Sequence, residues 1–279
     1  MKQTFLLLLT ALLTVSCERM WLSDDDSDNV HITFSATNTR GSSVSDYFQK
    51  LNVQLFDAQG EKVFDKVKTQ LAEDDGFGEM SMSLSAGDYT IVAVGHSSIK
   101  SATIKSPEMV QFTASDGEKL TDTFCYCGSI TVGEEPAQYH FTMRRVTAMF
   151  QFRITDESVP ESFTQMKFDY TGGSANFNPS TFEGTTKSTQ SELRNRASSY
   201  QVFTFPYMDE SGTLKIKVSA LDQNDQVIRS RTFSDIPVTR NRITTYTGHF
   251  FEPGDGVITQ TDFGFNVNGE WDGEDHFTF

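Results

Sequence analysis

Side chains that could perform catalysis are scattered along this sequence. The five histidines stand at positions 31, 96, 140, 249 and 276, in no spacing typical of a catalytic or metal-ligating set. Residues 95–98 read GHSS, but the second glycine of a strand-turn-helix nucleophile elbow is missing and no helical pattern follows. Carboxylates are plentiful, and two of them on distant loops leave no local signature. We therefore predict that the chain is not an enzyme and has no catalytic residue, metal or cofactor.

Two of the three cysteines, Cys125 and Cys127, flank a tyrosine in an expected strand. Their side chains then point to the same face about 7 Å apart, which is too far for an easy disulfide. With no second cysteine pair and no histidine nearby, they also make a poor zinc site. We interpret them as small residues of the core.

The remaining cysteine, Cys17, has the clearest chemistry in the sequence. Lys2 precedes an apolar run at residues 5–13, and small residues lead directly into the cysteine. This order resembles a lipobox, in which the thiol takes a diacylglyceryl group and the new N-terminus is acylated. The apolar run is shorter than the roughly 20 residues of a membrane-spanning helix. Residues 1–16 are thus predicted to be a signal peptide and Cys17 the lipidation site; an ordinary secretory peptide followed by a chance cysteine is the alternative.

Residues 17–29 are predicted to be a flexible tether behind the lipid. The run SDDDSD at 23–28 is too polar and too charged to fold alone. An acidic run in this place resembles the surface-export signal of Bacteroidetes-type lipoproteins, so we expect a lipid-anchored chain exposed at the cell outer membrane. A solvated spacer or a calcium-binding cluster is the alternative. The formal net charge of -15 repels phosphate backbones and argues against a nucleic-acid partner.

The rest of the sequence has the pattern of an all-β protein, and its length allows two domains. It contains 24 Phe and only 2 Trp, and its apolar residues alternate or run in short blocks cut by Gly, Asp and Asn. Residues 213–221 alternate apolar and polar, and a turn at 222–225 leads into a partner strand at 227–233.

The first half holds a comparable pair of expected strands. Leu51, Val53 and Leu55 alternate before a turn at 57–60, and a second run follows at 63–67. Residues 87–95 then form a near-continuous apolar strand, typical of a sandwich interior. This strand is weakly echoed by residues 212–218, which favours two similar sandwiches in tandem.

The boundary between the two sandwiches is predicted near residue 145. Tyr139, Phe141 and Met143 occupy odd positions, but the apolar residues from Val146 to 154 occupy even ones. Because a one-residue slip turns every later side chain over, the chain either has a bulge there or leaves one core for another. We predict an N-terminal β-sandwich at 30–144 and a C-terminal one at 145–279.

Four segments carry a resemblance to a known family. They are residues 85–90 (SAGDYT), 145–150 (RVTAMF), 236–248 (IPVTRNRITTYTG) and 263–271 (FGFNVNGEW). With the lipobox and the acidic tether, the chain resembles the fimbrillin superfamily, in particular its minor-fimbrillin or fimbrial-anchor (FimB-type) branch. The resemblance implies two transthyretin-like β-sandwich domains, no catalytic activity, and assembly with other fimbrial subunits by β-strand addition.

The resemblance also implies where strand addition takes place. In that family, polymerising subunits are cut after an arginine, and loss of the first strand opens a groove that a neighbouring subunit fills. Arg40 stands where such a cut could fall, after an expected first strand at 31–36. We prefer an uncut chain, because an anchor must keep its lipid joined to its domains. Phe263, Phe265 and Val267 lie in the expected strand-addition segment.

The sequence thus predicts a fimbrial anchor or minor subunit at the cell surface, without choosing between base, shaft and tip of the fimbrium. A glycan-binding surface lipoprotein is the alternative, because flat aromatic rings bury sugar faces well. A host or bacterial surface ligand is therefore left open, and a hydrolase ranks last. The aromatic residues that could form a glycan platform are Trp21, Tyr200, Tyr207, Tyr246 and Trp271.

Overall fold

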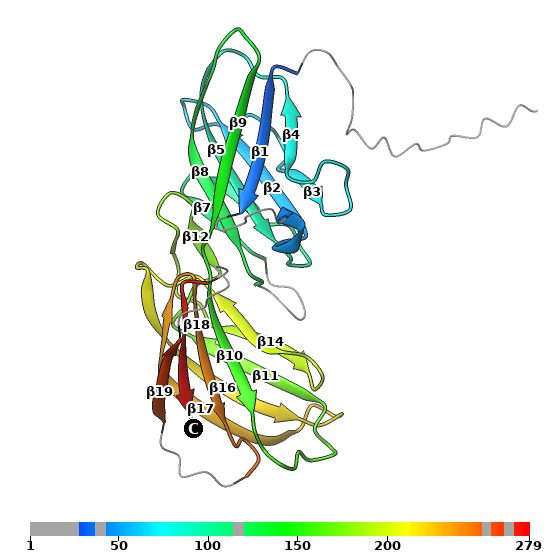
Figure 1. Ribbon diagram of the computed structural model, residues 1–279, viewed down its shortest axis with the longest axis vertical. Coiled ribbons are helices and arrows are strands. Elements are labelled where there is room, and N and C mark those ends of the chain that lie inside the picture. Colours follow the sequence, from blue (N-terminus) through cyan, green and yellow to red (C-terminus); the bar gives the residue numbers. More distant parts are fainter. Residues whose placement is uncertain (1–27, 37–42, 114–119, 253–257, 265–270) are drawn as a thin grey trace, which may run out of the picture.

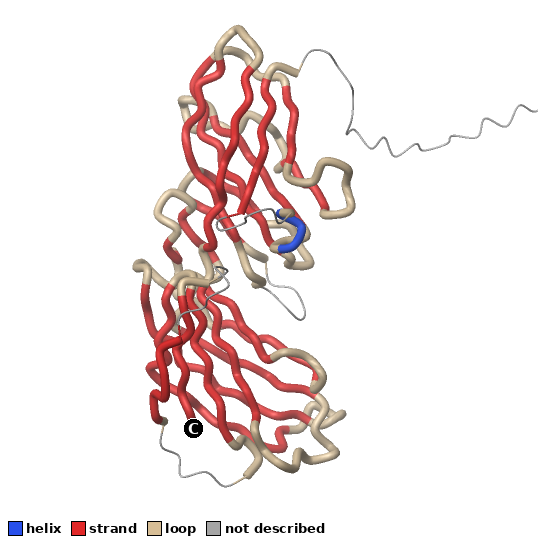
Figure 2. The backbone as a smooth tube through the Cα atoms, in the orientation of Figure 1, coloured by secondary structure: helices blue, strands red, loops and turns tan. Residues whose placement is uncertain are grey.

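The computed structural model describes residues 28–36, 43–113, 120–252, 258–264 and 271–279, which form β-strands and one short 3-10 helix. The predicted all-β fold class is confirmed. In the part of the chain described, no helix has the length and apolar character needed to cross a bilayer. The strands make two lobes stacked along the long axis of the molecule (Figure 1). Figure 2 shows that both lobes consist almost entirely of strands and the loops that connect them.

In chain order the elements are β1 (Val30–Ala36), the 3-10 helix η1 (Val44–Asp46), β2 (Lys50–Phe56), β3 (Lys68–Leu71), β4 (Glu79–Met82), β5 (Gly87–His96), β6 (Thr103–Ser106), β7 (Met109–Gln111), β8 (Phe124–Val132), β9 (Ala137–Arg145), β10 (Ala148–Ile154), β11 (Gln165–Thr171), β12 (Asn176–Asn178), β13 (Glu183–Gly184), β14 (Gln190–Asn195), β15 (Tyr200–Thr204), β16 (Ser211–Leu221), β17 (Val227–Thr239), β18 (Arg242–Gly248), β19 (Thr259–Gly264) and β20 (Gly273–Thr278).

The upper lobe consists of a seven-stranded sheet in the order β3-β2-β5-β8-β9-β1-β4. Its strands β8 and β9 pair only where β8 begins and β9 ends, at Phe124 opposite Arg145 and Cys125 opposite Arg144. The sheet therefore folds over into two layers, and the apolar side chains of both layers meet between them. This upper core includes Ile32 and Phe34 of β1, Leu51 and Val53 of β2, Ile91 of β5 and Phe141 of β9.

The lower lobe is a sandwich of two sheets, ordered β15-β10-β18-β20-β19 and β14-β11-β16-β17. The expected hairpin between residues 213–221 and 227–233 is confirmed as β16 and β17, which pair antiparallel. Alternate residues of β16 point inward, because the period of a strand is two. The lower core between the sheets includes Phe150, Phe152, Phe168, Ile216, Val218 and Phe233.

A third core lies at the waist, where both halves of the sequence contribute. The waist sheet has the order β13-β12-β7-β6, and its β7 and β12 pair through Val110 opposite Phe177. Val92 and Val94 of β5 face this core, while Ile91 and Ala93 of the same strand face the upper core. A strand buried on both faces explains the near-continuous apolar run predicted at 87–95.

The change of inward face at Arg144 and Arg145 is also confirmed. Phe141 and Met143 belong to the upper core, whereas Phe150 and Phe152 belong to the lower one. The chain therefore leaves one core for another rather than forming a bulge. The sequence does not predict the hydrogen-bonded waist sheet, and the division into domains at 30–144 and 145–279 stays a prediction.

The prediction of a strand at residues 63–67 was wrong. Residues 63–66 form bends, and the partner of β2 is β3, which begins at Lys68. After the turn at 57–60 the amide nitrogen of Val63 still donates to the carbonyl of Leu55 (2.9 Å). The Gln54 side chain then donates to the carbonyl of Phe64 (2.8 Å), so a buried side chain takes the place of a backbone partner.

Arg145 joins the two lobes. Its Nε donates to both carboxylate oxygens of Asp122 (2.8 and 3.0 Å), and its Nη1 donates to Oδ1 of Asn241 (2.8 Å). The guanidinium lies 3.9 Å from the ring centre of Trp271 and 4.7 Å from that of Phe124. Because the Arg145 side chain is only 5% exposed, these ionic and cation-π contacts form largely out of water.

We expect Arg145→Ala to lower the free energy of unfolding by about 2 to 3 kcal/mol, because it leaves the partly buried Asp122 without its partner. Arg144→Ala is the matched control, since Arg144 is the adjacent, exposed residue of the same strand, and it should cost less than about 0.5 kcal/mol. Equilibrium unfolding in guanidinium chloride measures both. Equal losses in the two variants would contradict this role for Arg145.

Candidate functional site

The first strand, β1, lies in a groove between β9 and β4. It pairs parallel with β9 from Val30 to Ala36 and antiparallel with β4 from Val30 to Thr33. In the sheet β1 therefore separates β9 from β4, and each of these two strands pairs with β1 rather than with the other. The groove is thus a seat for one extended segment.

Apolar burial holds β1 in this seat. Val30, Ile32, Phe34 and Ala36 all point inward and are at most 3% exposed. Full burial of a side chain such as Ile32 or Phe34 stabilises by about 2 kcal/mol. Asn29 fixes the start of the strand, because its side-chain amide exchanges hydrogen bonds with the backbone of Leu84 (2.8 and 2.9 Å).

At the other end of the molecule, β19 and β20 form one side of the five-stranded sheet. β20 pairs parallel with β18 and antiparallel with β19, so β19 is the edge strand. An edge strand presents backbone N–H and C=O groups on its outer side, which is where another extended chain can add.

The contacts that hold β20 are polar in the middle of the strand and aromatic towards its two ends. Asp275 accepts from Arg242 (3.0 Å), and Glu274 accepts from the Thr245 hydroxyl (2.5 Å). Trp271, just before the strand, stacks on Arg145. Phe279, just after it, stacks on Phe152 with a ring-centre distance of 5.1 Å. The middle of β20 therefore buries much less apolar surface than β1 does.

Most of the predicted site residues lie outside the described part of the chain. These are Cys17, Arg40, Phe265 and Val267. Phe263 lies in β19 with its backbone opposite Asp275, and its side chain is outside what the structure describes. The structure thus places one end of the expected strand-addition segment in an edge strand, and the roles of all five residues stay predictions.

The aromatic residues considered for glycan binding do not form one exposed face. Tyr246 is 2% and Trp271 9% exposed, so both are core residues. Tyr200 packs half-buried against the lower core, and Tyr207 lies against Lys187 beside a surface depression of about 430 Å³. Trp21 is outside the described residues. The arrangement gives no support to a coplanar sugar platform.

The GHSS segment is structural. His96 is fully buried, and its Nδ1 accepts from the amide of Ser98 (3.1 Å), so its Nε2 carries the proton and donates to Oδ1 of Asn52 (2.8 Å). Burial, together with the charge of Lys50, lowers the pKa of His96 to about 3. A neutral imidazole with both nitrogens engaged has no lone pair left to activate a serine.

The two cysteines are core residues, as expected. Cys125 is fully buried in the waist core, and Cys127 packs half-buried against it. Burial and the neighbouring Cys127 raise the pKa of the Cys125 thiol, and burial raises the pKa of Cys127. Both thiols are therefore kept protonated and unreactive.

Carboxylate pairs do not line either of two surface depressions among the described residues. One depression is the shallow site beside Tyr207, and a second, of about 500 Å³, lies between Phe152, Arg196 and Tyr200. Neither is lined by an Asp, Glu or His. Their geometry gives no support to the hydrolase hypothesis.

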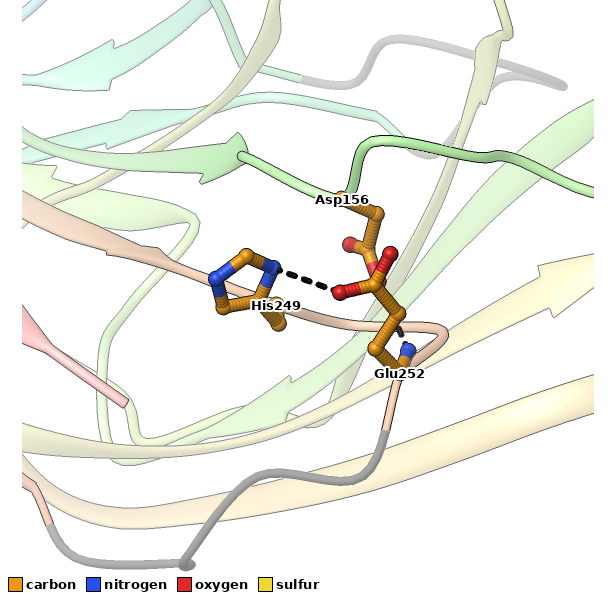
Figure 3. Close-up of side chains that lie close together, drawn as sticks. All are labelled: Asp156, His249 and Glu252. Carbon is orange, nitrogen blue, oxygen red and sulfur yellow. Dashed lines mark hydrogen bonds and ion pairs between the residues drawn. The ribbon is translucent and has the colours of Figure 1, made fainter.

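One titratable cluster was missed by sequence reasoning. Asp156, His249 and Glu252 lie close together beyond the ends of β10 and β18 (Figure 3). The sequence does hold a signal, a histidine followed by a glutamate three residues later. The third member is far away along the chain, and only the parallel pairing of β10 with β18 brings it near.

Comparison with known proteins identifies matches that cover most of the chain. The family model for fimbrillin-A associated anchor proteins Mfa1 and Mfa2 matches residues 22–276. No curated relative matches the chain. Among solved structures, a candidate adhesin from Bacteroides ovatus has a TM-score of 0.48 and 13% identity, and the alignment covers 72% of this chain and 76% of that one. The fimbrial anchor protein Mfa2 from Porphyromonas gingivalis has a TM-score of 0.41 and 15% identity, over 72% of this chain and 80% of that one.

We expect the amides of β20 to exchange hydrogen faster than those of β1 in native-state exchange, because β1 buries four apolar side chains and the middle of β20 is polar. Mass spectrometry of deuterium uptake in peptides covering 28–36 and 271–279 measures the difference. Slower exchange in β20 than in β1 would show that β20 is the more firmly held of the two strands and would contradict this prediction.

Proposed function

Because the chain belongs to the family of fimbrillin-A associated anchor proteins Mfa1 and Mfa2, we propose that it is a lipid-anchored fimbrial anchor or minor subunit that binds another fimbrial subunit by strand addition. Membership makes it a fimbria-associated surface protein with a structural role. The finer points, namely the lipid on Cys17, the outer-membrane location and strand addition, are the proposal.

The placement of the two candidate strands supports an anchor. β1 begins at the outer end of the upper lobe, and β20 runs down the lower lobe towards its far end (Figure 1). A lipid on Cys17 would therefore attach next to one end of the molecule, while the edge strand β19 belongs to the other lobe. This separation leaves a partner free to bind away from the membrane.

The anchor role favours an uncut chain. A lipid on Cys17 is joined to the lobes only through β1 and the segment after it, so cutting after Arg40 would leave noncovalent contacts alone to hold the protein to the membrane. In an anchor β1 stays in its position between β9 and β4, and the surface that binds another subunit is the β19 edge. A host or bacterial surface ligand is not needed for this role.

We expect Cys17→Ala to release the protein from the outer membrane, because a lipid is its proposed attachment. Membrane fractionation and mass spectrometry of the native protein should find a lipid-modified chain starting at Cys17, cut by external protease in intact cells. A wild-type chain starting at Gly41 would instead make it a polymerising subunit, and a Cys17→Ala chain that stays membrane-bound would contradict lipid anchoring.

A photo-crosslinking amino acid at Thr259, exposed on the edge strand β19, should give adducts with another fimbrial subunit in intact cells. The matched control is the same amino acid at Ser191, exposed on β14, the edge strand of the opposite sheet. Gel electrophoresis and mass spectrometry identify the partner. Adducts from Ser191 and none from Thr259 would exclude the β19 edge as the binding surface.

A further inference from the structure

Three side chains of types that bind metal ions lie together beyond the ends of two parallel strands. β10 and β18 are neighbours, and Ile154 at the end of one lies opposite Gly248 at the end of the other. Asp156 and His249 therefore follow these strands at the same end of the sheet, and Glu252 comes three residues after His249 (Figure 3). One ligand atom from each of the three side chains lies within 4.8 Å of the other two.

Backbone hydrogen bonds fix the central carboxylate. Asp156 accepts from the amides of Phe250 (2.6 Å), Phe251 (2.7 Å) and Glu252 (2.7 Å). Its Oδ2 takes a single one of these bonds and so keeps a second lone pair for another partner. Phe250 is fully buried in the lower core, so the loop that carries the ligands is attached to a rigid base.

The other two side chains are more exposed, and Oε1 of Glu252 accepts from the amide of Glu157 (3.2 Å), so that Oε2 is the oxygen that faces His249. Nδ1 of His249 lies 3.1 Å from Oε2 of Glu252, and the two side chains are 49% and 39% exposed. Bonds of about 2.1 Å to zinc place tetrahedral ligand atoms about 3.4 Å apart, so a small rotation of His249 and Glu252 completes the site. Binding through Nδ1 uses the tautomer that carries its proton on Nε2, which leaves the Nδ1 lone pair for the metal.

We propose that Asp156, His249 and Glu252 bind a divalent first-row transition metal ion, with Zn²⁺ favoured. One imidazole nitrogen and two carboxylates form a ligand set that suits Zn²⁺ and leaves a fourth position for water. Ca²⁺ and Mg²⁺ prefer sites made of oxygen alone, so the histidine selects against them. Two formal negative charges balance the ion.

One nearby charge opposes the ion. Arg229 donates to the carbonyls of Phe251 (3.2 Å) and Glu252 (3.3 Å), so it braces the loop from the backbone and does not occupy a ligand atom. Its positive charge weakens attraction for a second cation at this distance. The site is therefore expected to release its metal to a strong chelator such as EDTA.

The test is a calorimetric titration of ZnCl₂ into the detergent-purified protein, without a polyhistidine tag and after EDTA treatment. We expect one equivalent of Zn²⁺ to bind with a rise in melting temperature, and no competition from a tenfold excess of MgCl₂ or CaCl₂ in a matched titration. His249→Ala and Glu252→Gln should each weaken binding by at least about tenfold.

The matched control is His276→Ala. His276 also lies beside a carboxylate, 3.5 Å from Glu274, but in β20 and outside the three-ligand group, so its loss should leave zinc binding unchanged. The melting temperature of each metal-free variant verifies its folding. Absence of stoichiometric binding by wild type, or equal effects of the His249 and His276 variants, would overturn the site. Neither result bears on the fimbrial role, because the test contains no partner subunit.

Discussion

The Arg145 side chain lies where three segments that are distant in sequence meet. It comes at the end of β9, its ionic partner Asp122 precedes β8, and its ring partner Trp271 precedes β20. A guanidinium can make all these contacts at once, because its planar face stacks on rings while its edge donates hydrogen bonds. Lysine, a point charge on a flexible stem, offers no such combination. Arg145 therefore contributes both to the orientation of the lower lobe and to the position of β20.

The waist is the second connection between the two lobes. Val110 and Phe177 pair across the two halves of the sequence, and the surrounding apolar residues form a core that belongs to neither lobe alone. A shared sheet restricts hinge motion far more than a linker does, because bending it would break backbone hydrogen bonds inside an apolar core. The two lobes are accordingly expected to move together rather than as domains joined by a flexible linker.

The sequence predicts those parts of the fold that depend on local periodicity. The alternation in β16 and β17, the doubly buried β5 and the change of face at residue 145 all follow from the two-residue period of a strand. It fails where a side chain replaces a strand partner, as Gln54 does at residues 63–67. It also fails for parallel pairing, because nothing local in β1 tells that its neighbour is β9. The cluster around His249 was missed for the same reason.

Parallel pairing also sets the direction in which the lower lobe can carry load. β10, β18 and β20 run the same way, so their starts gather at Arg145 and their ends gather beyond Ile154 and Gly248. On the proposed function, a partner strand on β19 would pull against β20, and β20 is fixed at its start by Trp271 and at its end by Phe279. These contacts, together with the stacking of Phe277 on Tyr246, hold β20 in register while the edge beside it stays accessible. An anchor needs both properties in the same sheet, since it must bind a partner strand without giving up its own.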